Sequence, residues 1–143
     1  MRTITILLVF LLAGCVSAKP EPSQSQRPVL LDTVVFPETP SHVYDEAYTL
    51  AFEHGFQIAY SSPEERMLVM ELPSPDAIFK VGPDWIQRVE IFVREREARG
   101  VLYLRYYSYD PDDGDVRVVE DDREVAASFL SALRRRLMPP SEP

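Results

Sequence analysis

Apolar and polar residues alternate in four short segments of the chain. A period of two residues is that of a β-strand with one buried face. The alternation predicts strands over residues 56–61, 66–72, 85–97 and 101–110. Turn residues separate these segments, so we expect an antiparallel meander that buries one face of its sheet.

The alternation also predicts which side chains share the buried face. In each segment every second residue is apolar, whereas the residues between them include most of the polar and charged ones. A register slip of one residue would exchange the two faces, so this prediction depends on an unbroken period. We expect the sheet to bury Phe56, Ile58, Tyr60, Leu68, Met70, Leu72, Val89, Ile91, Val93, Leu102, Leu104 and Tyr106.

Two further segments extend the predicted sheet at its ends. Residues 29–36 (VLLDTVVF) are apolar and β-branched, which predicts a strand before the meander. Residues 116–121 predict a short final strand. The connections are a proline-broken loop over residues 73–84 and turns over residues 98–100 and 110–115.

Apolar residues spaced by three and four positions predict two helices. The first covers residues 42–54, with Ser41 as its N-cap and Gly55 as its C′ residue. The second begins where Asp121 and Glu124 have the spacing of a capping box. Its apolar stripe and the prolines that stop it are Ala126, Phe129, Leu130, Leu133, Leu137, Pro139 and Pro140.

These elements define the fold class. Two amphipathic helices and a one-sided sheet bury their apolar faces best against each other. We therefore expect a single α+β domain over residues 29–138. Its antiparallel sheet has four to six strands, and both helices pack on one face of that sheet.

The stretch VYDEAYTLAFEHGFQIAYSSPEERMLVMEL, residues 43–72, resembles the helix-grip domains of the BamC family. In that family a helix leads into a glycine, a strand, a turn and a second strand, and Gly55, Phe56 and Ile58 match this pattern. The resemblance implies a helix-grip-like fold and a lipoprotein of the outer-membrane protein assembly machinery. The chain has one such domain where BamC has two and lacks that family's long unstructured segment, so we do not carry over its partner.

The N-terminus, MRTITILLVFLLAGC, has the features of a secretory signal peptide. Arg2 supplies a positive charge, and an apolar run follows over residues 4–12. This run is shorter than the roughly 20 apolar residues that span a bilayer. The motif LAGC, which ends at Cys15, resembles the lipobox of bacterial lipoproteins.

The lipobox resemblance implies processing of this end of the chain. Cleavage falls between Gly14 and Cys15, and Cys15 then carries the diacylglyceryl and acyl (palmitate) groups. Several acyl chains anchor a protein stably where one does not. We expect a signal peptide over residues 1–14, a lipidated flexible tether over residues 15–28 and a disordered tail over residues 139–143. The alternative is that Cys15 is an incidental cysteine of an ordinary signal peptide.

The same resemblance predicts the subcellular location of the protein. Val16 rather than aspartate follows the cysteine, which in enteric bacteria favours the outer membrane, on its periplasmic face. The inner membrane is the alternative. Because Cys15 is the only cysteine, a mature domain whose cysteine is lipidated forms no disulfide and no zinc–thiolate site.

The net charge of −8 limits the classes of binding partner that we expect. Nucleic acid binding is driven by neutralisation of phosphates, so an acidic chain is a poor candidate for it. We expect a membrane contact through the lipid anchor, another envelope protein as partner, and no nucleic acid.

Candidate catalytic and metal-binding residues are few. His42 and His54 lie near opposite ends of the predicted helix, too far apart to share a zinc ion. The chain has no G-x-S-x-G elbow and no glycine-rich phosphate loop. In DPDDGD, Gly114 falls at the fifth position from Asp110, which is wrong for an EF-hand and favours a solvated turn, with adventitious calcium binding as the alternative. We predict no enzyme activity, no cofactor and no metal.

The sheet face opposite the predicted core is rich in aromatic residues and arginine. It carries Ala59, Met67, Val69, Arg88, Phe92, Arg94, Tyr103, Arg105 and Tyr107. Tyrosine and arginine are enriched in protein interfaces, and a large apolar patch usually marks a binding site. The partner-binding residues that we predict are Phe92, Arg94, Tyr103, Arg105 and Tyr107. The alternative is that these residues only stabilise the sheet as cross-strand pairs.

The sequence thus predicts a lipid-anchored, non-enzymatic envelope protein that binds another protein, in outer-membrane assembly or a related process. The alternative function is a periplasmic carrier of a small apolar ligand, held in a cavity between helices and sheet. The large side chains predicted in the core favour a filled interior over such a cavity. Enzyme activity is a third hypothesis, which a cleft with clustered, perturbed titratable groups would favour.

Overall fold

The computed structural model describes residues 26–73 and 85–139. Its elements are β1 (Val29–Phe36), α1 (Pro40–Glu53), β2 (Gln57–Ser62), β3 (Met67–Pro73), β4 (Ile86–Arg96), β5 (Arg99–Tyr109), β6 (Val116–Arg117) and α2 (Glu120–Leu137). The predictions on the signal peptide, the lipidation of Cys15, most of the tether, residues 74–84 of the predicted loop and the end of the tail lie outside the described residues. Pro73, predicted as the first residue of that loop, is the last residue of β3.

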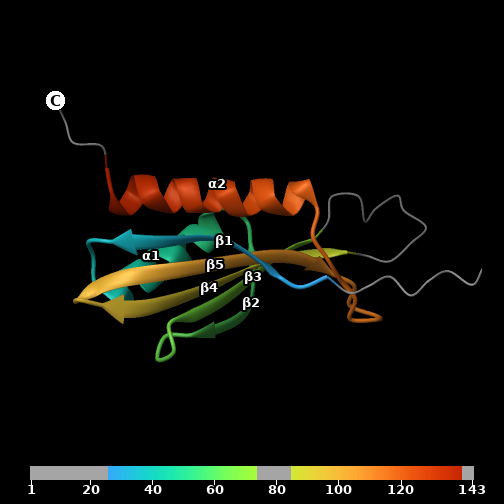
Figure 1. The fold of residues 1–143 in the computed structure, drawn as a ribbon, viewed down its shortest axis with the longest axis horizontal. Coiled ribbons are helices and arrows are strands. Elements are labelled where there is room, and N and C mark those ends of the chain that lie inside the picture. The colour runs from blue at the N-terminus through green and yellow to red at the C-terminus, as the bar shows by residue number, and fades with distance from the viewer. Residues whose placement is uncertain (1–25, 74–84, 140–143) are drawn as a thin grey trace, which may run out of the picture.

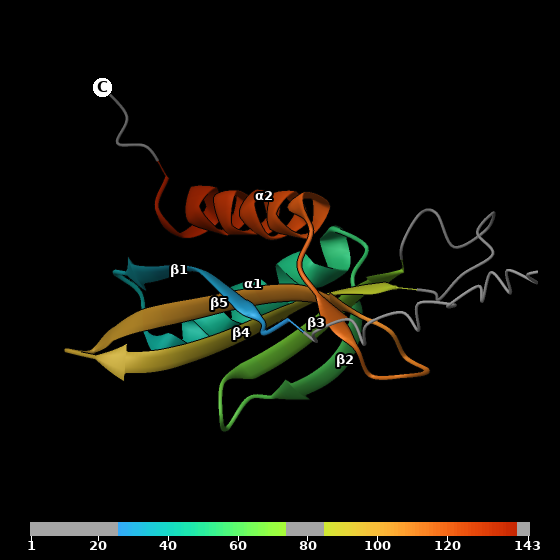
Figure 2. The same cartoon turned by 45° about the vertical axis from the view of Figure 1, so that its right-hand side comes forward.

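The strands form one six-stranded sheet in the order β1-β5-β4-β3-β2, and β6 also pairs with β5. All of the pairings are antiparallel. Figures 1 and 2 show α1 and α2 on one side of this twisted sheet, and no helix of the described residues covers the opposite side. The predicted α+β fold is confirmed, including the antiparallel sheet and the two helices on one face.

The core lies between the helices and the covered face of the sheet. Helix α1 contacts the strands from β2 to β5, and α2 contacts β1, β4 and β5. The alternation predicted for β3, β4 and β5 is confirmed, because its apolar positions point into this core. The core side chains include Val34, Phe36, Val43, Ala47, Leu50, Leu68, Met70, Val89, Ile91, Val93, Leu102, Leu104, Tyr106, Ala126, Phe129, Leu130, Leu133 and Leu137.

Strand β2 departs from the predicted alternation. The pairing of β2 with β3 shifts register between Ile58 and Tyr60. A β-bulge adds one residue to one strand and turns the following side chains to the other face. Tyr60 is therefore 47% exposed rather than in the core, and its hydroxyl lies 3.4 Å from Glu65. The prediction that Tyr60 belongs to the core is wrong for this reason.

The hairpin between β4 and β5 is tighter than predicted. Arg96 pairs with Arg99, so the turn consists of Glu97 and Ala98 rather than residues 98–100. Both turn residues have positive φ, 55° and 62°. A two-residue hairpin turn of type I′ requires this conformation, which is usually supplied by asparagine and glycine.

Gly100 lies outside the β4–β5 turn, and its role is in the packing of α1 against β5. Its N–H donates a 2.7 Å hydrogen bond to the carbonyl oxygen of Glu38. A Cβ atom at this position would lie 2.7 Å from Cγ2 of Val43 in α1. The absence of a side chain therefore lets the first turn of α1 approach β5 closely.

Helix α1 starts two residues earlier than predicted and ends at Glu53, one residue before the predicted end, while Gly55 is the C′ residue as predicted. Thr39, not Ser41, is the N-cap, and its side chain accepts a 3.4 Å hydrogen bond from the N–H of His42. Gly55 has a φ of 76° at C′, and Phe56 N–H reaches the carbonyl oxygen of Ala51 at 3.0 Å. Together with the bond from Gly55 N–H to Phe52 O, this is a Schellman motif.

The start of α2 uses a different aspartate from the one predicted. The N-cap is Val119, which has no side-chain acceptor. Asp122 is 2% exposed, and its Oδ2 accepts a 3.0 Å hydrogen bond from the N–H of Val119. Its Oδ1 accepts a 2.7 Å hydrogen bond from Ser108 Oγ in β5. The predicted pair of Asp121 and Glu124 is wrong, because both residues are exposed.

The acidic segment between β5 and β6 forms the predicted turn. Gly114 has a φ of 74°, and its N–H donates a 2.8 Å hydrogen bond to the carbonyl oxygen of Asp110. The strand that follows is shorter than the predicted range of 116–121, because α2 already begins at Glu120.

Candidate functional site

The candidate site lies on the sheet face that the helices leave uncovered, which we call the outer face. Cross-strand pairing brings Phe92 of β4 opposite Tyr103 of β5, and Arg94 opposite Val101. Because side chains two residues apart share a face, Arg105 lies on the outer face as well. The predicted partner-binding residues therefore do share this uncovered face, as the alternation indicates.

One half of the outer face is a closed polar network. Arg88 Nε donates a 2.9 Å hydrogen bond to Glu71 Oε1, and its Nη2 contacts the same oxygen. Arg88 Nη1 also donates to the hydroxyl of Tyr107 at 3.3 Å. Burial lowers the pKa of Arg88, but the hydrogen bonds to Tyr107 and Glu71 raise it by more. Arg88 is thus fixed as a cation with its partners.

The same network continues through Tyr107 to Arg105. The hydroxyl of Tyr107 donates a 2.7 Å hydrogen bond to Glu90 Oε1. Arg105 Nη2 donates a 2.6 Å hydrogen bond to Glu90 Oε2. Glu90 is only 8% exposed, so its charge is compensated inside the face rather than by solvent.

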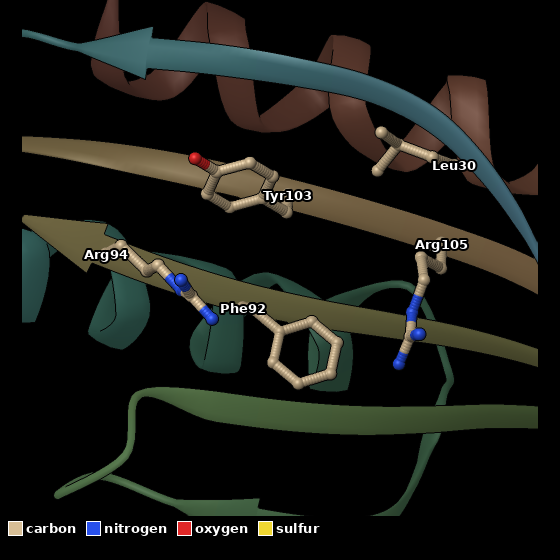
Figure 3. A pocket seen from close by; sticks show the side chains of 5 residues that line it. All are labelled: Leu30, Phe92, Arg94, Tyr103 and Arg105. Atoms are coloured by element: carbon tan, nitrogen blue, oxygen red, sulfur yellow. The ribbon is translucent and has the colours of Figure 1, made fainter.

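The other half of the outer face is hollowed. A depression of about 510 Å³ is lined by Leu30, Phe92, Arg94, Tyr103 and Arg105. We call it the outer-face hollow. Figure 3 shows the ring of Phe92 between the side chains of Arg94 and Arg105, with Tyr103 on β5 and Leu30 on β1 completing the wall.

The two arginines of the hollow differ in their partners. The guanidinium of Arg105 lies 4.8 Å from the centre of the Phe92 ring and is bound to Glu90. The guanidinium of Arg94 lies 6.0 Å from the centre of the Tyr103 ring. In the described parts of the chain, no carboxylate forms an ion pair with Arg94. Arg94 is therefore an exposed cation of the hollow that has no carboxylate partner among the described residues.

The structure brings Phe92, Arg94, Tyr103 and Arg105 together but does not bring Tyr107 into the hollow. Tyr107 is 6% exposed and its hydroxyl is committed to Glu90. For Tyr107 the geometry matches the alternative of cross-strand stabilisation. Partner binding by the four residues of the hollow stays a prediction.

Leu30 is the lining residue that the sequence analysis missed. It is 52% exposed and pairs with Arg105 across the β1–β5 ladder. The register of that ladder shifts between Leu30 and Asp32. A signal for Leu30 was present in the apolar run VLL, but only the pairing of β1 with β5 shows that it borders the hollow.

The histidines and the acidic turn do not form a reactive centre. His42 and His54 lie at opposite ends of α1, and the ring of His54 packs edge-on to Phe129 with centres 6.2 Å apart. Within residues 26–73 and 85–139, no three His, Cys, Asp or Glu side chains gather in a way that could hold a metal ion.

The space between helices and sheet is occupied by large side chains. Phe36, Phe129 and Met70 are fully buried there, with Leu68, Ile91, Leu102, Leu104 and Leu133 around them. This packing gives no support to the alternative of a ligand carrier. Neither of the helices in the described ranges has the length and apolar character needed to cross a membrane.

No protein-family model matches the chain, and no curated protein matches it significantly. Functional inference therefore depends on the sequence motifs and on the geometry of the outer face.

Proposed function

We propose that this protein is a lipid-anchored lipoprotein of the bacterial cell envelope that binds another envelope protein without catalysing a reaction. The outer-face hollow is the observation that carries the proposal. It combines aromatic and aliphatic walls with an arginine that lacks a carboxylate partner in the described residues. Aromatic residues and arginine dominate the energetics of protein interfaces when they are desolvated together.

The position of the hollow also supports this proposal. It opens on the sheet face that the helices leave uncovered, so a partner reaches it without any rearrangement of the core. Leu30, in its wall, is the second residue of β1 and lies 15 residues after Cys15 in the chain. An extended chain covers at most about 3.3–3.6 Å per residue, so a lipid at Cys15 would keep the hollow within roughly 50–54 Å of the membrane.

Membrane location is part of the same proposal. The lipobox motif at residues 12–15 supports lipidation of Cys15, and Val16 supports retention in the outer membrane, facing the periplasm. The inner membrane is the alternative address. On the resemblance to BamC domains, we extend the proposal to an accessory role in outer-membrane protein assembly.

Co-purification tests the proposal directly. The full-length lipidated protein is purified from native membranes in mild detergent, and proteins recovered with it are identified and quantified. We expect a stoichiometric envelope partner. Cys15→Ala should release the protein from the membrane and lose the partner, whereas recovery of the wild-type protein alone would refute a stable complex.

A pair of matched substitutions tests the face. Phe92→Glu places a carboxylate in the hollow and should reduce recovery of the partner by about tenfold or more, since hot-spot residues are worth roughly 2 kcal/mol. Phe52→Glu is the control, because Phe52 is 58% exposed on α1, away from the outer face. Equal recovery in the two variants would contradict the assignment of this face.

A further inference from the structure

We propose that the outer-face hollow binds an extended segment of the partner protein in which an apolar side chain stands next to an aspartate or glutamate. This inference rests on the protein-binding function proposed above and adds the chemistry of the partner. It follows from the walls and the charge of the hollow.

The walls of the hollow favour the binding of an apolar side chain of the partner. Leu30 is 52% exposed, and the rings of Phe92 and Tyr103 are half-buried in the sheet surface beside it. These three side chains come from β1, β4 and β5, so they form a surface that is wider than one strand. Burying such a surface against an aliphatic or aromatic side chain is favourable by roughly 25 cal/mol per Å² of apolar area.

The positive charge of Arg94 favours one carboxylate of the partner beside that apolar side chain. Glu90 already compensates Arg105, which leaves Arg94 as the cation of the hollow that has no carboxylate partner among the described residues. Arg94 gives the hollow one positive charge, although the chain as a whole has a net charge of −8. An arginine fork binds a carboxylate with two parallel hydrogen bonds, which is strong and directional.

The charge of the hollow favours a protein segment over a lipid surface. Recognition of anionic lipid headgroups uses clusters of about four to eight basic residues. One uncompensated arginine supplies too little attraction for such a surface but enough to orient one acidic side chain.

Site-specific photo-crosslinking tests the inference in the full-length protein in native membranes. Leu30→p-benzoylphenylalanine places the photoreactive group in the wall of the hollow and leaves Arg94 and Tyr103 intact. After irradiation, the linked segment of the partner is identified by mass spectrometry. We expect an apolar residue with an aspartate or glutamate within two positions of the linkage.

Charge reversal then tests the role of Arg94. Arg94→Glu should reduce the crosslinking yield by about tenfold, and lysine at the identified carboxylate of the partner should restore it in that variant. Arg96→Glu is the matched control, because Arg96 is exposed on the same strand outside the hollow and should keep the full yield.

Each outcome separates the two proposals. The inference is overturned if Arg94→Glu leaves the yield of the crosslinked protein unchanged, or if the crosslinked segment contains no carboxylate. Either outcome still agrees with the proposed protein-binding function. Crosslinks to lipid alone overturn the inference in favour of a membrane-facing hollow. No crosslink from the hollow, together with a complex that survives Phe92→Glu, overturns the inference and the assignment of the binding face.

Discussion

Tyr107 of β5 donates a 2.7 Å hydrogen bond to Oε1 of Glu90 in β4, where both residues are less than a tenth exposed. The hydroxyl also accepts a 3.3 Å hydrogen bond from Arg88 Nη1. This relationship joins the Glu71–Arg88 ion pair to the Glu90–Arg105 ion pair. Tyr107 therefore links the two ion pairs and supplies the second donor to the buried carboxylate of Glu90.

We expect Tyr107→Phe to destabilise the fold by about 1.5–3 kcal/mol, because it removes a hydrogen bond to a buried carboxylate. Urea denaturation at pH 7 measures the change. Tyr103→Phe is the matched control, because no side-chain hydrogen bond of Tyr103 is present in the described structure, and its effect should stay within about 0.5 kcal/mol. Similar losses in both variants would show that the network contributes no specific stability.

Stability should also fall at alkaline pH. Burial and the hydrogen bond to Glu90 raise the pKa of Tyr107, although Arg88 opposes this, and burial with the bond to Glu71 raises the pKa of Tyr109. Above a pH of about 10 the unfolded chain loses these protons first, so the free energy of unfolding decreases as pH rises. Below that pH both states are protonated, and these tyrosines contribute no slope.

Urea midpoints measured from pH 9 to pH 11.5 check this dependence. The double variant Tyr107→Phe/Tyr109→Phe should show a shallower loss of stability across that window. An unchanged slope would mean that other groups cause the alkaline loss.

Gly100→Ala should cost about 1–3 kcal/mol, since the new methyl group would overlap Val43 in α1. Adding Val43→Ala to this variant removes the overlapping side chain. The double variant should therefore lose less stability than the sum of the two single variants, which a double-mutant cycle in urea would measure. Strict additivity would refute the close approach of α1 to β5.

Asp122→Ala should destabilise the protein by about 1–3 kcal/mol, because it leaves Ser108 and the N–H of Val119 without their acceptor. Asp121→Ala provides the comparison, since Asp121 is exposed in the same turn and carries the same charge. Thermal unfolding of the two variants distinguishes a specific cap from a general dipole effect, which would lower both melting temperatures equally.

The sequence was sufficient to predict the core faces of β4 and β5. Both strands keep an unbroken period of two over 11 residues, so Ile91 and Leu104 could be assigned to the core and Phe92 and Tyr103 to the opposite face. Tyr60 was assigned to the wrong face because a bulge interrupts the period of two in β2. No residue type in β2 indicates the position of this bulge.

Other errors came from choices between equivalent residues or from non-local pairing. Asp121 and Asp122 are adjacent and chemically identical, and only packing against Ser108 of β5 selects Asp122 as the cap. Similarly, Leu30 joins the hollow through a pairing with Arg105, 75 positions away in the chain. Local patterns carry no information on such contacts.

The place of β1 at the edge of the sheet has a mechanical consequence. If the protein is held by a lipid near its N-terminus, tension between membrane and partner first loads the hydrogen bonds of Gln26 to Val116 and Val118 and then reaches Val29, the first residue of β1. Tension directed along β1 would load its hydrogen bonds to β5 simultaneously, whereas tension directed away from the sheet would break them one after another. Leu30 is the next residue to be peeled away, so the wall of the hollow would come apart before the core opens. The strength of partner binding under tension would then depend on the direction of the force.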